Sequence, residues 1–366
     1  MARVIHEADW ALFCRVIDNH GDLGVCWRLA TQLAARGVAV QLFVDDASAL
    51  RWMAPSDCPG VSVRPWPVDS EVFTPQQVPG VVIEAFGCEL PVAYQAAMAA
   101  RSRPPVWINL EYFSLEASAQ RNHGLPSPVL NGPAKGLTKW FYYPGWGENS
   151  GGLLAGCLPA DESPPGKNNA TLHPQTSTTP ASGACDTAPL NISVFCYEPV
   201  GLGLWLTQLA ALPPQVHLHV TAGRATAAVQ QAMKAAGVSG LCVSFLDYMD
   251  QTAYDGLLAR MDLNLVRGED SLVRALCAGK PFLWQIYPQH DGAHLPKLQA
   301  FLAQTGAPPV VVQAHLAWNA DSSVQLPGLT PEHLAEWSAW ASRLQAELAG
   351  QTGLTERLMG FAATKG

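Results

Sequence analysis

The chain has 366 residues, with 22 Lys and Arg against 30 Asp and Glu, so its formal net charge is −8. A single hydrophobic core rarely organises this length, which predicts two domains. With 48% hydrophobic and 14% charged residues, the composition indicates buried sheets and excludes disorder over the whole chain. The acidic balance argues against nucleic acid as a partner, because neutralising phosphates requires clustered Lys and Arg.

The N-terminus and the cysteines bear on the compartment of the protein. The first residues include His6, Glu7 and Asp9, which is not the pattern of a secretory signal. No apolar run reaches the roughly 18 residues of a membrane helix. The nine cysteines show neither a CxxC pair nor zinc-ligand spacing. We therefore expect a cytoplasmic protein without disulfides, metal or membrane contact. We also expect a monomer, although no motif in the sequence fixes the oligomeric state.

Strands and helices alternate in the first half of the chain. Apolar runs bounded by polar residues predict strands over 10–17, 38–44, 81–83 and 106–109. Helices are expected over 25–36, from Asp45 onward and over 91–100. Strands that alternate with helices in this way form parallel βαβ units.

The composition changes over residues 159–189, which are rich in Pro, Ser, Thr, Asn and Ala. Too little apolar surface is present there to offset the entropy of ordering, so we predict a flexible linker or surface insertion. The alternation then resumes, with strands over 192–196, 217–220, 241–245, 263–266 and 281–286. Helices are expected over 202–211, 225–236, 251–261, 271–278, 294–304, 332–348 and 355–362.

These elements predict an α/β fold of two Rossmann-like, doubly wound domains that face a central cleft. The first domain should cover 1–158 and the second 190–349, with a C-terminal helix at about 350–366 that packs back on the first. Ligands of such sheets bind beyond the carboxyl ends of the strands. Polar residues at those ends are therefore the candidate site residues.

The first candidate cluster follows the first predicted strand and begins the first helix. It contains Asp18, Asn19, Gly21, Asp22 and Gly24. The spacing Gly-x-x-Gly is not the GxGxxG dinucleotide fingerprint, which argues against a nicotinamide enzyme. Two carboxylates on a glycine turn are suited to acid–base chemistry. The alternative is that either aspartate only caps the helix.

A second cluster, Arg267-Gly-Glu-Asp-Ser271, follows the buried strand at 263–266. Free N–H groups at the start of the next helix attract a pyrophosphate, and Arg267 adds positive charge beside them. The Glu269 carboxylate is suited to accept hydrogen bonds from ribose hydroxyls. The alternative is a capping box with Asp270 as the cap.

A third and weaker cluster consists of aromatic and amide side chains near other strand ends. Its members are Phe195, Tyr197, Tyr248, Gln251 and Tyr287. Aromatic side chains in such positions can sandwich a nucleobase, but they are more often part of the core.

Several segments that include these clusters resemble the EarP family, the protein-arginine rhamnosyltransferases that modify translation elongation factor P. The resemblance spans nearly the whole chain apart from 159–189. The segments that carry it are 16–30, 108–112, 125–128, 150–153, 267–271, 278–282 and 286–289.

The resemblance implies a glycosyltransferase of the GT-B type that uses no metal and no cofactor. Family members move L-rhamnose from dTDP-β-L-rhamnose, with inversion, to one arginine of elongation factor P. The modified factor relieves ribosomes stalled on proline runs. In the family the N-terminal domain engages the protein acceptor and the C-terminal domain holds the nucleotide sugar.

The resemblance also assigns roles to residues. The essential carboxylates of the family fall on Asp18, Asp22 and Glu269. Its donor contacts fall on Asn19, Gly21, Phe195, Tyr197, Tyr248, Gln251, Arg267, Glu269, Asp270, Ser271 and Tyr287. This chain departs from the family pattern at His20, where Phe is usual, and at Asp250, where Pro is common.

The chemistry of arginine explains why carboxylates are needed. A guanidinium is a poor nucleophile with a pKa of roughly 12.5–13.8. A carboxylate binds its planar fork bidentately and then removes a proton. We expect Asp22 to be the general base and Asp18 its orienting partner, although the reasoning allows these roles to be exchanged. Two alternatives remain at this point: a GT-B enzyme with another sugar or acceptor, and a nucleotide-binding protein without transferase activity.

Overall fold

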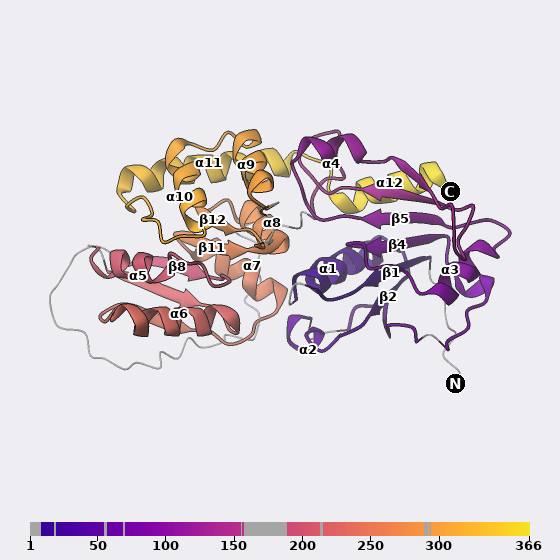
Figure 1. Cartoon of the computed structure of the whole chain (residues 1–366), viewed down its shortest axis with the longest axis horizontal. Coiled ribbons are helices and arrows are strands. Elements are labelled where there is room, and N and C mark those ends of the chain that lie inside the picture. The colour runs from indigo at the N-terminus through magenta and orange to yellow at the C-terminus, as the bar shows by residue number, and fades with distance from the viewer. Residues whose placement is uncertain are drawn as a thin grey trace. The chain divides into compact units, whose positions relative to one another are not determined.

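The computed structural model describes residues 9–17, 20–54, 57–68, 70–154, 156, 189–212, 215–288, 292 and 294–366. Two compact units divide the chain: Met1–Ala155 together with Gly350–Gly366, and Gly156–Ala349. Each unit contains its own parallel sheet with helices packed on it (Figure 1). The insertion predicted over 159–189 lies, apart from Pro189, outside the described residues.

The sheet of the first unit has seven strands in the order β3-β2-β1-β4-β5-β7-β6. All neighbours pair in parallel except β6 and β7, which are antiparallel. The strands are β1 (Trp10–Cys14), β2 (Val40–Val44), β3 (Val61–Pro65), β4 (Val81–Ala85), β5 (Val106–Leu110), β6 (Pro126–Pro128) and β7 (Thr138–Tyr142).

Side chains alternate between the two faces of this sheet and bury both of them. Leu12 and Ile83 belong to one core cluster, whereas Phe13 and Val82 belong to the cluster on the opposite face. Both faces are therefore covered, as in other parallel sheets. The helices of this unit are α1 (Gly21–Ala35), α2 (Leu50–Met53), α3 (Val92–Ala99), α4 (Ala117–Asn122), the short 3₁₀ helix η1 (Pro75–Gln77) and α12 (Leu354–Lys365).

The C-terminal helix α12 belongs to the first unit although it follows the second in sequence. Leu354 and Leu358 are buried in the same core cluster as Leu12. The segment before α12 passes close to Gly152, whose φ is +71°, and a Cβ there would lie 2.9 Å from the Thr352 carbonyl oxygen. The Ser-Gly-Gly-Leu motif at 150–153 thus permits close packing of two chain segments.

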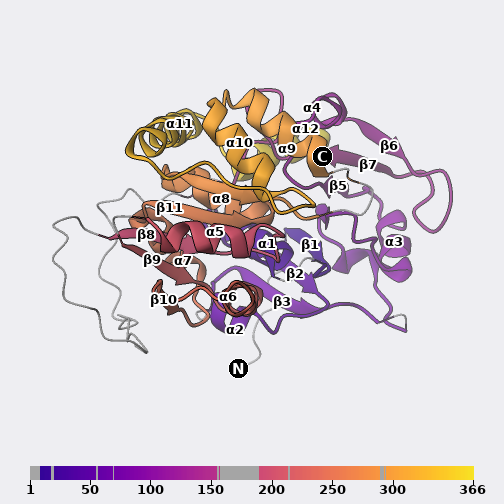
Figure 2. The ribbon, with the colours of Figure 1, turned by 60° about the vertical axis from the view of Figure 1, so that its left-hand side comes forward.

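The sheet of the second unit has five parallel strands in the order β10-β9-β8-β11-β12. They are β8 (Leu190–Val194), β9 (Val216–Val220), β10 (Cys242–Phe245), β11 (Leu263–Arg267) and β12 (Phe282–Gln285). The helices are α5 (Leu202–Ala210), α6 (Arg224–Ala236), α7 (Gln251–Arg260), α8 (Gly268–Ala278), α9 (His294–Gln304), α10 (Pro309–Trp318) and α11 (Pro331–Ala349). Helices α9, α10 and α11 lie beside one another (Figure 2).

Several predicted elements differ from the structure. Helix α1, predicted over 25–36, begins at Gly21, and the helix expected from Asp45 onward is the short α2 (Leu50–Met53). The elements β3, β6, β7, α4 and α10 were not predicted. The strand predicted over 10–17 ends at Cys14. Beyond it, backbone amides bind side-chain carboxylates instead of a neighbouring strand: Val16 N–H donates to Asp45 at 3.0 Å and Ile17 N–H donates to Asp22 at 2.9 Å. Helix α8 was expected to start at Ser271 but begins three residues earlier, at Gly268.

Within the described residues, no helix is long and apolar enough to cross a membrane.

Candidate functional site

The Asp22 side chain lies in the first turn of α1, at the carboxyl end of β1, and is 2% exposed. Its Oδ2 accepts the hydrogen bond from Ile17 N–H at 2.9 Å, and its Oδ1 accepts one from the Tyr112 hydroxyl, also at 2.9 Å. The carboxylate therefore ties together the segment after β1 and the segment after β5. Two donors on two different oxygens fix its plane.

The capping alternative for Asp22 is wrong. His20 occupies the N-cap position of α1, and the His20 side chain makes no cap hydrogen bond. The Asp22 carboxylate instead reaches back to Ile17, before the helix. His20, at the position where the resemblance leads one to expect Phe, places its ring 5.2 Å from Trp52 in an edge-to-face arrangement. The histidine at this position thus makes an aromatic contact with α2.

Three other predicted residues belong to this first cluster. Asp18 and Asn19 lie outside the described residues, so their roles stay predictions. Gly21 is the first residue of α1, and a Cβ built on it meets no atom within 4 Å. Neighbouring atoms of the chain therefore do not require glycine at this position.

The second cluster begins α8 at the carboxyl end of β11. Gly268 has a φ of +66°, a conformation that favours glycine, and its carbonyl accepts a hydrogen bond from Trp284 Nε1 at 2.8 Å. Glu269 and Asp270 lie in the first turn of the helix. The Lys297 ammonium of α9 is 2.5 Å from Glu269 Oε1. This lysine adds a second cation to the cluster that contains Arg267.

The capping-box alternative for Asp270 is also wrong. Arg267 is the N-cap residue of α8, and no side chain makes the cap hydrogen bond. The buried Ser271 hydroxyl instead accepts a hydrogen bond from Arg267 N–H at 3.0 Å and donates one to the Arg267 carbonyl. Ser271 therefore holds the strand-to-helix turn, and Asp270 is not used for capping.

The Arg267 guanidinium is held against two aromatic rings. Its central carbon lies 4.3 Å from the ring centroid of Phe195 and 4.7 Å from that of Tyr197. It also donates from Nη1 to the Cys196 carbonyl at 3.0 Å. Tyr287 makes an edge-to-face contact with Tyr197, with centroids 5.5 Å apart. Four predicted residues from three strand ends are thus brought together: Phe195, Tyr197, Arg267 and Tyr287.

The aromatic residues of the third cluster differ in their exposure. Tyr197 is buried, as the core alternative expects, whereas Tyr248 and Tyr287 expose 55% and 41% of their surfaces. Exposed aromatic rings beside a cation are able to stack on a planar ligand. Gln251 is the first residue of α7, and the Asp250 side chain caps that helix by accepting from Ala253 N–H at 2.7 Å. Asp250 thus stabilises the helix start at a position where the family commonly has Pro.

Burial limits the chemistry available to the thiol in this cluster. Cys196 is fully buried, and burial raises its pKa to about 12. A thiol with that pKa remains protonated near neutral pH and is a poor nucleophile. Carboxylates, aromatic rings and cations are therefore the groups that this cluster offers to a ligand.

Several contacts of these clusters were missed by sequence reasoning. Tyr112 lies in the segment 108–112, which carried the family resemblance, but no role was assigned to it. Lys297 lies within a predicted helix and gave no signal. Gln285 was not predicted as a site residue, but its Oε1 accepts a hydrogen bond from Tyr197 N–H at 2.8 Å and so holds the segment that carries Tyr197. Arg224 pairs with Glu198 and lies over the Tyr197 ring, 5.0 Å from its centroid.

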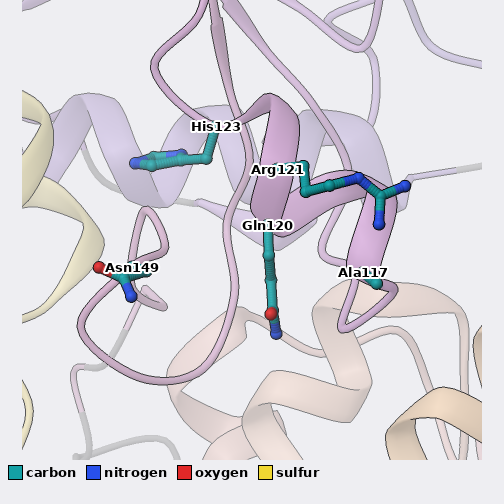
Figure 3. Close-up of a pocket in the computed structure, with 5 residues that line it drawn as sticks. All are labelled: Ala117, Gln120, Arg121, His123 and Asn149. Atoms are coloured by element: carbon teal, nitrogen blue, oxygen red, sulfur yellow. The ribbon is translucent and has the colours of Figure 1, made fainter.

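An open pocket of about 460 Å³ lies beside α4 in the first unit. Its lining residues are Ala117, Gln120, Arg121, His123 and Asn149 (Figure 3). Burial and the nearby Arg357 lower the pKa of His123, so its ring is neutral near pH 7. None of the predicted site residues lines this pocket.

In the described part of the chain, no group of three or more His, Cys, Asp and Glu side chains is arranged to hold a metal ion.

The sequence resemblance is confirmed by comparison with known proteins. The sequence model of the family described as "Elongation-Factor P (EF-P) rhamnosyltransferase EarP" matches residues 10–363. The chain is 40% identical to a protein-arginine rhamnosyltransferase of Pseudomonas aeruginosa and 39% identical to one of Pseudomonas putida. Each alignment covers 97% of this chain, and they cover 99% and 98% of the two relatives.

Solved structures confirm the GT-B prediction. A structure described as the basis for EarP-mediated arginine glycosylation of translation elongation factor EF-P matches with a TM-score of 0.62 and 28% identity, covering 97% of this chain and 98% of that one. MurG of Acinetobacter baumannii matches with a TM-score of 0.51 and 13% identity, covering 97% of this chain and 99% of its own. The distant MurG match bears on the fold alone.

Proposed function

This chain belongs to the EarP family of rhamnosyltransferases, and we propose that it transfers L-rhamnose from dTDP-β-L-rhamnose to one arginine of translation elongation factor P, with inversion at the anomeric carbon. The observation that carries the proposal is the family match over residues 10–363. The buried, doubly hydrogen-bonded Asp22 and the cluster around Arg267 supply groups of the kind that this reaction requires.

In the proposed acceptor step, a guanidinium nitrogen attacks the anomeric carbon of rhamnose. The new N–C bond forms as the bond from that carbon to the dTDP oxygen breaks, and the electron pair leaves with dTDP. Asp22 accepts the proton that the attacking nitrogen loses, so the product guanidinium keeps its single positive charge. Asp18 orients the guanidinium in this proposal, and the transition state has oxocarbenium character.

In the proposed donor site, the exposed rings of Tyr248 and Tyr287 flank the thymine, with Phe195, Tyr197 and Gln251 completing the base and ribose contacts. Arg267 and the N-terminal amides of α8 stabilise the negative charge that develops on the diphosphate. Glu269, Asp270 and Ser271 lie in that same first turn of α8. Asn19 and Gly21 contact the rhamnosyl group.

The proposal is tested by following dTDP release chromatographically. The protein is incubated with dTDP-β-L-rhamnose, with and without elongation factor P, and dTDP-glucose serves as the alternative donor. We expect release that requires both the acceptor and the rhamnosyl donor and that persists in the presence of EDTA. Release only with another sugar would indicate a different transferase, and binding without release would indicate a nucleotide-binding protein.

The remaining elements of the proposal follow from the acceptor. Because a translation factor acts where ribosomes are, we propose that this protein is located in the cytoplasm. A single copy of this chain contains both groups of site residues, so we propose that a monomer is active. The product is proposed to support translation through proline runs.

A further inference from the structure

The Asp22 carboxylate is held by a residue distant in sequence. Tyr112, which follows β5, donates its hydroxyl hydrogen to Asp22 Oδ1 at 2.9 Å, across a separation of 90 residues. Ile17 N–H binds the other oxygen. Because Asp22 is 2% exposed, these bonds lie where little water competes with them.

Tyr112 is in turn held by a ring on a third strand end. The Phe86 ring, after β4, stacks on Tyr112 with centroids 4.2 Å apart and an angle of 13° between the planes. Phe86 has a φ of +56°, in the left-handed region that residues with a side chain rarely adopt. Phe86 N–H donates to the Leu110 carbonyl at 2.7 Å. Unfavourable backbone conformations of this kind persist where surrounding contacts fix them, and they gather at functional sites.

We propose that the Phe86–Tyr112 stack positions the Asp22 carboxylate to accept the proton that the attacking guanidinium nitrogen loses, with Tyr112 as a positioning residue. This inference rests on the proposed function of Asp22 as the general base.

A tyrosine hydroxyl suits this task because it is a neutral donor. A cationic donor in its place would repel the positively charged acceptor and would weaken the carboxylate as a base. The hydroxyl restricts rotation of the carboxylate without adding charge. Loss of such alignment lowers the rate of the chemical step while donor binding is preserved, because correct geometry contributes to the transition state.

The test uses the full chain with three variants. Tyr112→Phe removes the hydroxyl but keeps the stacked ring, and Phe86→Leu removes the stack but keeps the hydroxyl. Tyr94→Phe is the matched control, since Tyr94 packs against Phe13 on the opposite face of the sheet and its buried hydroxyl lacks a partner in the described structure. For each variant, kcat, the donor KM and the thermal unfolding midpoint are measured.

We expect Tyr112→Phe to lower kcat about 10- to 100-fold, with the donor KM and the unfolding midpoint close to wild type. Phe86→Leu should lower kcat less, and Tyr94→Phe should leave it unchanged. A wild-type kcat in Tyr112→Phe, or a loss confined to donor KM, would overturn the positioning role. If the wild-type chain transfers no rhamnose, the proposed function fails instead, so the two failures are distinguishable.

Discussion

At the scale of single residues, the two carboxylates proposed for the chemistry are held in different ways. Asp22 receives hydrogen bonds from a backbone amide and a tyrosine hydroxyl, both neutral donors. Glu269 instead forms an ion pair with Lys297 at 2.5 Å. Glu269 is thus already paired with a cation of its own unit, whereas the hydrogen bonds that Asp22 receives from Ile17 and Tyr112 come from neutral groups. A carboxylate held by neutral groups is the arrangement that the proposal assigns to the general base.

This difference predicts the effect of Asp22→Asn. The amide is nearly isosteric but cannot accept a proton, so transfer should fall by about 10²- to 10⁴-fold, the usual contribution of a general base. Affinity for dTDP, measured by calorimetry, should stay within twofold of wild type. Asp57→Asn, at an exposed position of the same unit, is the control. Retained turnover in Asp22→Asn would contradict the base assignment.

A second residue-scale prediction concerns the shape of the cation at position 267. Arg267→Lys keeps the charge but loses the planar group that lies on Phe195 and Tyr197. We expect dTDP to bind about tenfold more weakly, because stacked guanidinium contacts contribute roughly 1 kcal/mol or more. The exposed Arg64→Lys should bind dTDP as the wild type does. Equal affinity in both variants would show that Arg267 acts only through its charge.

Sequence reasoning reached some residues of the candidate site and not others. Asp22 and Glu269 were predicted because they follow buried strands, where parallel sheets gather their ligand contacts. Tyr112 and Lys297 were not, because their importance depends on contacts to residues 90 and 28 positions away. Such contacts arise from strand order, which a single sequence does not reveal.

At the scale of elements, α12 is the part of the first unit that comes from the far end of the chain. Leu358 is fully buried among residues of β1 and α1. Leu358→Ala should lower the free energy of unfolding by about 2–5 kcal/mol, because it leaves a cavity. Leu130→Ala, at a side chain that is 73% exposed, should cost less than about 0.5 kcal/mol. Urea unfolding measures both, and equal values would contradict the packing of α12.

Helix α10 is joined to β12 by a buried histidine, which predicts a dependence of stability on pH. His315 Nε2 faces Trp284 N–H at 3.1 Å and its Nδ1 faces the Val311 carbonyl at 2.9 Å, so the ring is neutral with the proton on Nδ1. Burial lowers the pKa of His315 to about 4. Its contribution is present above the unfolded value near 6.5 and is lost as the pH falls toward 4, by up to roughly 3 kcal/mol.

The measurement compares urea unfolding at pH 7 and pH 4.5. His315→Gln should be less stable than wild type at pH 7 but should lose less stability on acidification. His333→Gln, at a histidine near the surface, should lose as much as wild type does. An acid-induced loss in His315→Gln equal to that of wild type would contradict the role of this ring.

The predicted elements were most accurate where periodicity was strong. Apolar runs bounded by polar residues or glycine predicted the parallel strands β1, β2, β4 and β5 and the helices α5 to α9. Helix α10 was not predicted, although Pro308 and Pro309 mark its start. The antiparallel pair β6 and β7 was also missed; β6 has three residues, two of them proline, and thus carries no apolar run that would predict a strand.

At the scale of the whole molecule, bulk charge indicated little about the ligand. A net charge of −8 argued against a nucleic-acid surface, yet the proposed donor is an anion. The cations that would meet it, Arg267 and Lys297, belong to one strand-to-helix junction and its neighbour α9. Recognition of the proposed donor would therefore be local, and the sequence predicts it through the position of Arg267 at a strand end rather than through composition.

The fold and the acceptor-binding surface differ in how far the sequence predicted them. Both parallel sheets and the GT-B fold were predicted, and the family was identified from motifs that extend along most of the chain. The surface that would bind a folded protein acceptor was not predicted. Such a surface is assembled from side chains of several elements and has no single motif.

The most direct test of arginine rhamnosylation is tandem mass spectrometry of elongation factor P after incubation with this protein and dTDP-β-L-rhamnose. We predict that the acceptor gains the mass of one deoxyhexose and that fragmentation assigns it to a single arginine side chain. The Asp22→Asn protein, assayed in parallel, should leave the acceptor mass unchanged. An unmodified acceptor with the wild-type protein, or a sugar on a residue other than arginine, would contradict the account.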